Sequence, residues 1–246
     1  MALSEWKNHW MWKLGGARPW VAKQLNLKEN MKLLDVGTGD GLFCIQAGKL
    51  YKRIEFIGIE YSDEAKEAKE NILDAGLKNC KVLHINAYKL KCPYKYDRIV
   101  FFNSLRNIPT NKTEMIKLLK VMNKYLKEDG ILAIADMFKE DAKNKRQRLA
   151  QEIYADASKY NTEHTGVETF FNKKDVNSAL RIAGFKIDTI KKFKTGVKLN
   201  INQTKRFIKD EAEDNWSLIW ERFKEKIEKM KGIEPDANLS LILAHK

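Results

Sequence analysis

The sequence has few of the residues that build disulfide frameworks, metal sites or membrane spans. Its three cysteines, Cys44, Cys80 and Cys92, are scattered without C-x-x-C spacing, so we expect buried thiols rather than a redox or metal role. The four histidines form no cluster with acids at metal-ligand spacing, and no metal is expected. No run approaches the roughly 20 apolar residues that span a membrane. The N-terminus lacks a charged-then-apolar signal pattern, so we expect a cytoplasmic protein.

The sequence also has few features that mark a boundary between domains. The chain has four prolines, and no repeat, low-complexity tract or obvious linker. Its 246 residues, 43% apolar and 32% charged, suit one substantial globular core with a cap. We therefore expect a single domain over residues 1–246.

Positive charge is abundant, with 46 Lys plus Arg against 33 Asp plus Glu and a net charge of +13. The lysines are spread along the chain, and the densest runs are "KNKRQR" (143–148) and "KKFK" (191–194). Two interpretations stay open: a solvated surface, or a surface that binds a polyanion.

Short apolar runs alternate with helical patterns, which is typical of a parallel sheet covered by helices on both faces. The predicted strands are residues 32–37, 54–60, 81–86, 96–103 and 131–138. Helices are predicted over 41–50, over 63–75 and along the apolar face from Met115 to Leu126, after which "EDG" should break the chain. Only about ten residues separate the third and fourth strands, so we expect an abbreviated crossover there.

The second half departs from simple alternation. A surplus helix is predicted at about 141–162 as a cap, and a helical insertion at about 203–231. Between them we predict a helix over 176–185, stopped by Gly184, and a strand over 185–193. A last strand is predicted over 238–246, and segment 1–30 is a tryptophan-rich helical pattern.

The stretch "LLDVGTGDGLF" (33–43) places three glycines at alternate positions just after the first strand. Glycine permits positive φ and close approach of a ligand, and the N–H groups at the start of the next helix suit a carboxylate or phosphate. The G-x-G-x-G spacing differs from the dinucleotide fingerprint and lacks the Gly-Lys-Ser/Thr of a P-loop. A purely structural turn is the alternative.

Glu60 ends the second strand about twenty residues beyond these glycines. A carboxylate at this place can accept both hydroxyls of a ribose. The alternative is an exposed acid at a strand end.

Together, "LLDVGTGDG" and Glu60 resemble motif I and its acidic partner in class I S-adenosylmethionine-dependent methyltransferases. The resemblance covers about residues 15–246. It implies an α/β, Rossmann-like fold: a doubly wound, mostly parallel seven-stranded sheet with the last strand antiparallel and with helical cap insertions. It also implies S-adenosylmethionine as cofactor, S-adenosylhomocysteine as product, and no metal.

The resemblance also implies roles for individual residues. The methionine part of the cofactor should lie against Asp35 and the turn, the ribose on Glu60 and the adenine on Tyr61. Asn86 and Ala87 should border the adenine edge, where many relatives have an aspartate; Asn86 would accept from the adenine amino group through its carbonyl. The cofactor-binding set is Asp35, Gly37, Thr38, Gly39, Gly41, Leu42, Glu60, Tyr61, Asn86, Ala87 and Asn103.

The end of the fourth strand reads "FFNSLRNIP" (101–109) and has no paired prolines, which argues against methylation of exocyclic amines. Its "LRN", and "ARPW" at 17–20, resemble motifs of the ubiquinone/menaquinone C-methyltransferase group; Asn103-Ser104 and Ala17 depart from that group's pattern. The resemblance implies Arg106, Asn107 and Asn103 as catalytic candidates that position the acceptor or stabilise a developing anion. A salt bridge for Arg106 and a turn or helix cap for Asn107 are the alternatives.

Segments expected to cover the site supply four candidates for substrate contact: Trp12, Arg18, Trp20 and Tyr154. For tryptophans, packing on the core or on a second subunit is the alternative, and the oligomeric state is left open.

Three functions follow. The first is methylation of a small molecule, such as an aromatic, quinol-like or anionic metabolite. The second is methylation of RNA or a protein by way of the basic surface, which is not favoured. The third is a binding protein that keeps the fold without catalysis.

Overall fold

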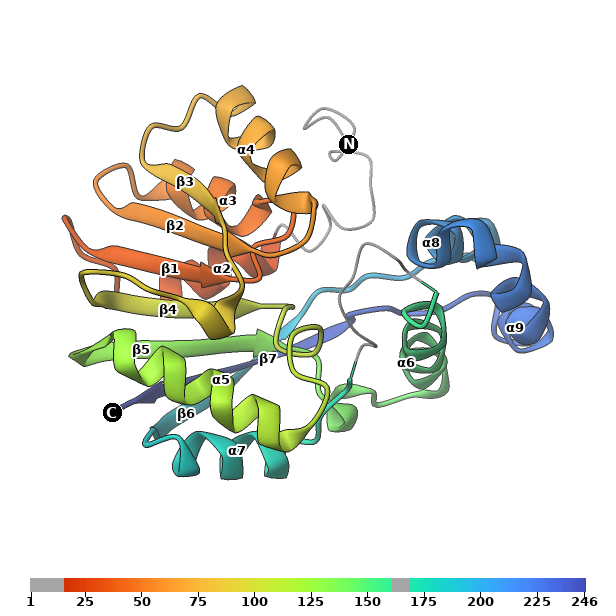
Figure 1. The fold of residues 1–246 in the computed structure, drawn as a ribbon. Coiled ribbons are helices and arrows are strands. Elements are labelled where there is room, and N and C mark those ends of the chain that lie inside the picture. The colour runs from red at the N-terminus through yellow and green to blue at the C-terminus, as the bar shows by residue number, and fades with distance from the viewer. Residues whose placement is uncertain (1–15, 161–168) are drawn as a thin grey trace.

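The computed structural model describes residues 16–160 and 169–246 and builds them around one seven-stranded sheet (Figure 1). The strand order is β3-β2-β1-β4-β5-β7-β6. The first five strands pair in parallel, and β7 is antiparallel to both β5 and β6. The expected sheet, with its antiparallel last strand, is confirmed. The strands are β1 (Lys32–Val36), β2 (Glu55–Glu60), β3 (Cys80–His84), β4 (Tyr96–Phe102), β5 (Leu126–Asp136), β6 (Lys186–Lys194) and β7 (Asn238–His245).

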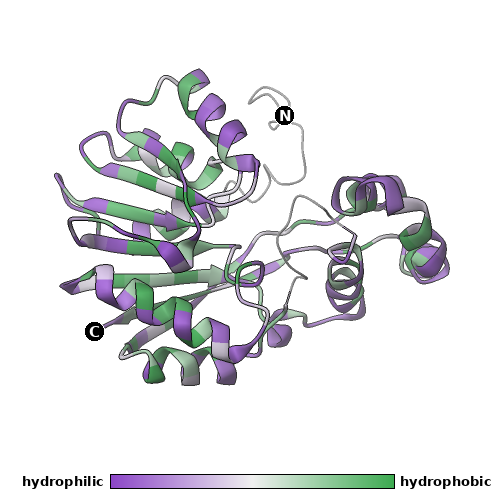
Figure 2. Ribbon diagram, in the orientation of Figure 1, coloured by the Kyte–Doolittle hydropathy of each residue, from purple (hydrophilic) through white to green (hydrophobic). Residues whose placement is uncertain are grey.

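Helices cover both faces of this sheet. On one face, buried residues of α2, α3 and α4 form a core cluster with strands β1, β2 and β7; on the other, α5 and α7 do so with β1, β4 and β5. In Figure 2 the helices alternate between hydrophobic and hydrophilic residues. These five helices are α2 (Ala17–Gln24), α3 (Leu42–Leu50), α4 (Glu64–Asp74), α5 (Lys112–Tyr125) and α7 (Lys173–Ile182).

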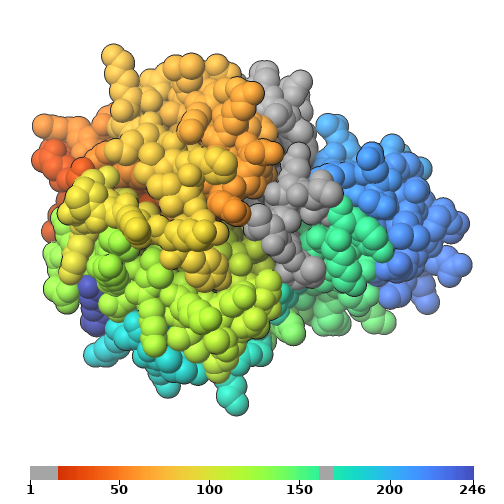
Figure 3. Space-filling model, in the orientation of Figure 1, coloured from red at the N-terminus to blue at the C-terminus, as the bar shows by residue number. Residues whose placement is uncertain are grey.

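A third hydrophobic cluster forms a cap of α6 (Lys145–Ala157), α8 (Ile201–Ala212) and α9 (Trp216–Met230). The cap lies beyond the ends toward which the arrows of β1, β4 and β5 point, and it stands out from the body of the molecule (Figures 1 and 3). The carboxyl ends of parallel strands are where open α/β sheets bind ligands. The surplus helices are therefore close to the edge at which a site is expected.

Asparagine fixes where four of these helices begin. In α5, α6, α7 and α8 the side-chain oxygen of the preceding residue accepts a hydrogen bond from the third backbone N–H of the helix, at 2.8–3.0 Å. Such a cap is worth about 1 kcal/mol, because it satisfies a donor that the helix leaves open. The capping residues are Asn111, Asn144, Asn172 and Asn200.

Several predicted boundaries were wrong. Strand β5 begins at Leu126 and contains "EDG", because the pairing with β4 shifts register and lets these residues bulge. The cap helix α6 starts at Lys145, after the short 3-10 turn η3 (Lys139–Asp141). Helix α7 starts at Lys173 rather than at residue 176. The expected abbreviated crossover between β3 and β4, by contrast, is confirmed: it contains the 3-10 turn η2 (Ala87–Lys89).

Candidate functional site

The glycine turn follows β1 with a backbone that other residues would strain. Gly37, Gly39 and Gly41 have φ of +67°, +53° and +82°. A Cβ on Gly37 would lie 2.8 Å from the Cβ of Ser104, so the turn packs tightly against the end of β4. The N–H of Gly37 donates to Ile59 of β2 at 2.9 Å. Glycine is therefore required at Gly37 for two reasons: its φ is positive, and the Ser104 side chain leaves no room for a Cβ atom.

Asp35 is the buried carboxylate at the end of β1. Its Oδ2 accepts a hydrogen bond from Thr38 Oγ1 at 2.6 Å and lies 3.5 Å from the Sγ of Cys44. Its Oδ1 is buried without a hydrogen-bond partner among the described residues. Burial raises the pKa of Asp35 to about 7. An unsatisfied buried acceptor of this kind fits a ligand donor such as an ammonium group.

Glu60 is held by four donors. Its Oε1 accepts from the backbone N–H of Tyr61 (2.7 Å), the N–H of Ser62 (3.0 Å) and the Ser62 hydroxyl (3.1 Å); its Oε2 accepts from Gly39 N–H at 3.0 Å. A carboxylate has about four acceptor positions. A ribose must therefore displace at least one donor, and the Ser62 hydroxyl has a second acceptor, Glu64 Oε2, at 3.5 Å.

The side expected to hold adenine is only partly as the sequence predicts. The Tyr61 side chain is 54% exposed, and its ring lies 6.1 Å from that of His84. Asn86 caps η2, because its Oδ1 accepts from Tyr88 N–H at 2.9 Å. The side-chain oxygen of Asn86, which was expected to accept from the adenine amino group, is thus already engaged. The amide NH2 group of Asn86 is better placed to meet the adenine, as a hydrogen-bond donor. Ala87 is buried at the start of η2.

The loop after β4 gathers unsatisfied polar atoms. Asn103 has φ of +52°, and its backbone N–H donates to Ala135 at 2.8 Å. Both polar atoms of the Asn103 side chain, and Oδ1 of Asn107, are buried without a partner among the described residues. Ser104 Oγ donates to the carbonyl of Val36 at 2.5 Å, which ties this loop to the glycine turn. Left-handed, unsatisfied amides at a strand end are typical of a binding site.

Arg106 lies in a buried charged network. Its Nη1 is 2.9 Å from Asp236 Oδ1 and 3.5 Å from Asp136 Oδ1, and all three side chains are at most 5% exposed. The hydroxyl of Tyr154 donates to Asp236 Oδ2 at 3.2 Å, and the Arg106 guanidinium lies over the Tyr154 ring at 5.0 Å and over that of Phe170 at 5.4 Å. Burial raises the pKa of Asp136 to about 6. The network joins β4, β5 and β7 to the cap helix α6.

Arg18 is also buried, at 3% exposure, with its guanidinium 5.2 Å from the Phe102 ring at the end of β4. Burial lowers the pKa of Arg18, and the carboxylates of Asp40, Asp35 and Asp236, in that order, oppose the shift. The structure therefore brings Arg18 together with the acids of the glycine turn.

The other substrate candidates lie differently. Trp20 packs against Phe193 of β6, with ring centroids 5.2 Å apart. Trp12 lies outside the described residues.

Sequence reasoning missed two acids. Asp40 lies between two glycines of the turn, its Oδ1 accepts from Leu42 N–H at 3.1 Å, and burial raises its pKa to about 6. Its position inside the motif was the available signal. Asp236 lies in the loop before β7, far along the chain from Arg106, and carries no sequence signal.

The described residues offer neither a metal-ligand cluster nor a membrane-spanning helix. Across ranges 16–160 and 169–246, no group of three or more His, Cys, Asp or Glu side chains could hold a metal ion. In those same ranges no helix is both long and apolar enough to cross a membrane.

The known proteins that this chain resembles include several methyltransferases. A family model described as a methyltransferase domain matches residues 27–206. The chain is 30% identical over 105 residues to a tRNA (guanine-N(7)-)-methyltransferase of Geobacillus kaustophilus, covering 39% of this chain and 48% of that protein. It is 36% identical over 111 residues to a ribosomal protein L11 methyltransferase of Lactobacillus johnsonii, covering 45% and 32%. The chain thus spans less than half the length of these curated relatives.

Solved structures agree on the fold. The YcgJ protein of Bacillus subtilis matches with a TM-score of 0.68 at 15% identity, covering 94% of this chain and 98% of that one. A SAM-dependent methyltransferase from Aquifex aeolicus matches with a TM-score of 0.53 at 24% identity, covering 70% and 81%. At these identities the likeness establishes the fold alone.

Proposed function

Since the chain belongs to the S-adenosylmethionine-dependent methyltransferase family, we propose that it transfers the methyl group of this cofactor to a small molecule, such as an aromatic, quinol-like or anionic metabolite. One observation carries the proposal. Buried polar atoms of Asp35, Asn103 and Asn107, which have no hydrogen-bond partner among the described residues, gather at the carboxyl ends of β1 and β4, beside the glycine turn.

The residues fit the cofactor. When bound, S-adenosylmethionine supplies a methyl group on a positively charged sulfur, open to attack by a nucleophile. Asp35 would accept from the α-amino group, because its Oδ1 is buried without a described partner. Glu60 would hold the ribose once Ser62 turns aside, and the exposed ring of Tyr61 would lie on the adenine. The adenine edge would meet Asn86 and Ala87, while Gly37, Gly39, Gly41, Thr38 and Leu42 would form the wall.

Arg18 fits the cofactor better than the acceptor. An amino acid group presents an ammonium and a carboxylate close together, so its site needs an acid and a base side by side. Arg18 interacts electrostatically with Asp35 and Asp40, and it is buried. A guanidinium binds a carboxylate with two parallel hydrogen bonds. We therefore assign Arg18 to the methionine carboxylate, opposite Asp35.

The acceptor would lie between the β4 loop and the cap. Asn103 and Asn107 would hydrogen-bond it, and Tyr154 would close the site from α6. Asp136 and Asp236 already neutralise Arg106, so stabilising an acceptor anion is not its main task. Arg106 is better described as a positioning residue, which fixes Tyr154 and the loop that carries Asn107. The remaining contribution is alignment of the acceptor atom with the methyl group and sulfur.

The test is transfer of a labelled methyl group. Purified protein is incubated with methyl-labelled S-adenosylmethionine and a small-molecule extract, and labelled products are separated by chromatography. The proposal predicts a labelled small molecule that is lost in Asn107→Ala while S-adenosylhomocysteine binding is kept. Label found only in RNA or protein would contradict it. Cofactor binding without any transfer would support a binding protein instead.

A second candidate function is methylation of RNA, and one observation favours it. Segments 112–127 and 173–194 carry most of the chain's net positive charge. This surface is distinct from the capped edge and is developed below.

A further inference from the structure

Two segments of the chain are rich in positive charge. Segments 112–127 and 173–194 contain twelve lysines or arginines and three acids, which gives +9 of the chain's +13. These segments form α5, the first two residues of β5, α7 and β6, and the two helices lie next to each other on the same face of the sheet (Figures 1 and 3). Seven exposed cations define what we name the basic face: Lys117, Lys120 and Lys124 on α5, Lys174 and Arg181 on α7, and Lys192 and Lys194 on β6.

None of these seven cations forms an ion pair with another residue of the described ranges. The three acids of the two segments are engaged elsewhere: Glu114 with Thr110, Asp175 with Lys112, and Asp188 with His245. The basic face therefore has an excess of positive charge. Lysines on an edge strand guard against strand pairing, which accounts for β6. Prevention of strand pairing does not explain the cations on helices α5 and α7.

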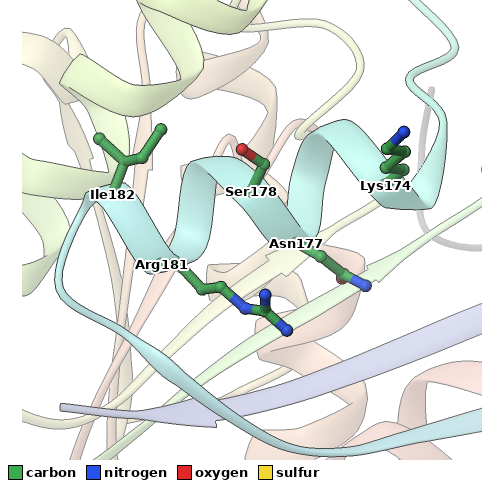
Figure 4. A pocket seen from close by; sticks show the side chains of 5 residues that line it. All are labelled: Lys174, Asn177, Ser178, Arg181 and Ile182. Carbon is green, nitrogen blue, oxygen red and sulfur yellow. The ribbon is translucent and has the colours of Figure 1, made fainter.

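A pocket of about 650 Å³ opens on α7 within this face (Figure 4). It is lined by Lys174, Asn177, Ser178, Arg181 and Ile182. Asn177 and Arg181 extend from the same side of the helix. The Oδ1 atom of Asn177 is buried and has no hydrogen-bond partner among the described residues.

The chemistry of this pocket is specific. Its two cations suit a phosphate group. A phosphodiester has no hydrogen to donate, however, so it cannot satisfy the buried oxygen of Asn177. That atom calls for a hydroxyl donor next to the phosphate. In the sugar–phosphate backbone of a nucleic acid this donor is the 2′-hydroxyl of a ribose, which distinguishes RNA from DNA.

The row on α5 extends the pattern. Lys117, Lys120 and Lys124 recur at intervals of three and four residues, so they share one helix face over about 10 Å. A row of cations beside the α7 pocket matches a chain of regularly spaced negative charges. Ile182 (53% exposed) and Ile190 (40% exposed) add apolar contact area for sugars or bases.

We propose that the basic face binds RNA through its phosphodiester backbone, with one nucleotide's phosphate and 2′-hydroxyl in the α7 pocket. This goes beyond the proposed function, because RNA held on the helical face need not be the methyl acceptor. It also does not depend on cofactor binding, so the two proposals fail separately.

The test is the fluorescence anisotropy of a labelled single-stranded RNA, titrated with the full chain at several salt concentrations. The face variant replaces Lys120, Lys174 and Arg181 by Gln. The matched control replaces Lys66, Lys69 and Lys78, three exposed lysines on or just after α4, in the same way. Loss of three phosphate contacts should reduce the slope of log affinity against log salt by about 2 and weaken binding about tenfold at low salt. The control should change neither. S-Adenosylhomocysteine binding, measured on both, verifies folding.

Asn177→Ala tests the pocket by itself. It should remove the preference for RNA over DNA of the same sequence and leave the salt slope unchanged. No RNA binding by the wild type, or equal weakening in the face and control variants, would overturn the proposal. Equal affinity of the wild type for RNA and DNA would overturn the assignment of the 2′-hydroxyl.

Discussion

Cofactor affinity is expected to follow the ionisation of Asp35. Burial raises the pKa of this carboxyl to about 7, and its Oδ1 has no described hydrogen-bond partner. A bound ammonium group favours the ionised form and so lowers the pKa. Binding should therefore release a proton from Asp35 at and below about pH 7.

The size of the effect follows from that pKa. With a value of about 7, roughly a tenth of the free protein has Asp35 ionised at about pH 6 and roughly nine tenths at about pH 8. The affinity for S-adenosylhomocysteine should rise about tenfold across this interval, or about 1.4 kcal/mol. Near pH 7, about half a proton should leave for each ligand bound.

Isothermal titration calorimetry measures both quantities, since the apparent enthalpy in two buffers of different ionisation enthalpy counts the protons released. Asp35→Asn should bind more weakly and show a nearly flat pH profile. Asp40→Asn is the matched control, because burial raises the pKa of Asp40 to about 6 on the same turn. A profile that persists in Asp35→Asn, or disappears only in Asp40→Asn, would refute the reasoning.

Other predictions concern strain, charge and stability. Gly37→Ala should lose both cofactor affinity and stability. Gly76→Ala has nearly the same φ (+65° against +67°) but lies in open space, so it should lose only about 1 kcal/mol of stability in denaturant titration. Equal losses in the two variants would contradict the close approach of Gly37 to Ser104. Ser62→Ala should bind S-adenosylhomocysteine at least as tightly as wild type in calorimetry, because it opens one acceptor position on the strand-end carboxylate; weaker binding would argue against that exchange. Arg106→Met should reduce the free energy of unfolding by about 3–5 kcal/mol, because it leaves two carboxylates buried and unpaired; an inactive variant of full stability would show a role in chemistry alone.

The pH dependence of stability has a definite sign. Burial raises the folded-state pKa of Asp35, Asp40 and Asp136 above the usual value for an aspartic acid, to about 7, 6 and 6. The folded protein then binds these protons more tightly than the unfolded chain does. Without cofactor, these groups should make the free energy of unfolding fall as pH rises from about 4 to about 7. Thermal melts of the wild type and of Asp35→Asn would reveal a smaller fall in the variant, and equal falls would contradict the assignment.

Most of the sheet could be predicted because its strands are short apolar runs that end in turn or acidic residues. The exceptions have local causes. "EDG" has the composition of a break, yet β5 starts before it, since a register shift lets a strand carry an unpaired bulge. Helix α7 begins at Lys173 because the Asn172 side chain caps it, ahead of the first apolar residue in the pattern, Val176.

The candidate site divides in the same way. The glycine turn and Glu60 lie within one short stretch, so their spacing is visible in the sequence. Asp236 approaches Arg106 only because β7 returns antiparallel beside β5. No pattern along the chain specifies the contact between these two residues. From the sequence alone, Arg106 could therefore form a salt bridge or contact the acceptor. Likewise, only the folded backbone reveals that Asn86 uses its oxygen as a helix cap.

The most direct test of the central claim is calorimetric titration of the wild type and of Glu60→Ala with S-adenosylmethionine and S-adenosylhomocysteine. We predict binding at about micromolar affinity in the wild type and a loss of at least about tenfold in Glu60→Ala. Glu70→Ala, at an exposed acid of α4, is the control that keeps its affinity. Absence of binding in the wild type would contradict the account. The glycine turn would then be structural or serve another ligand, and the methyltransferase proposal would fall with it.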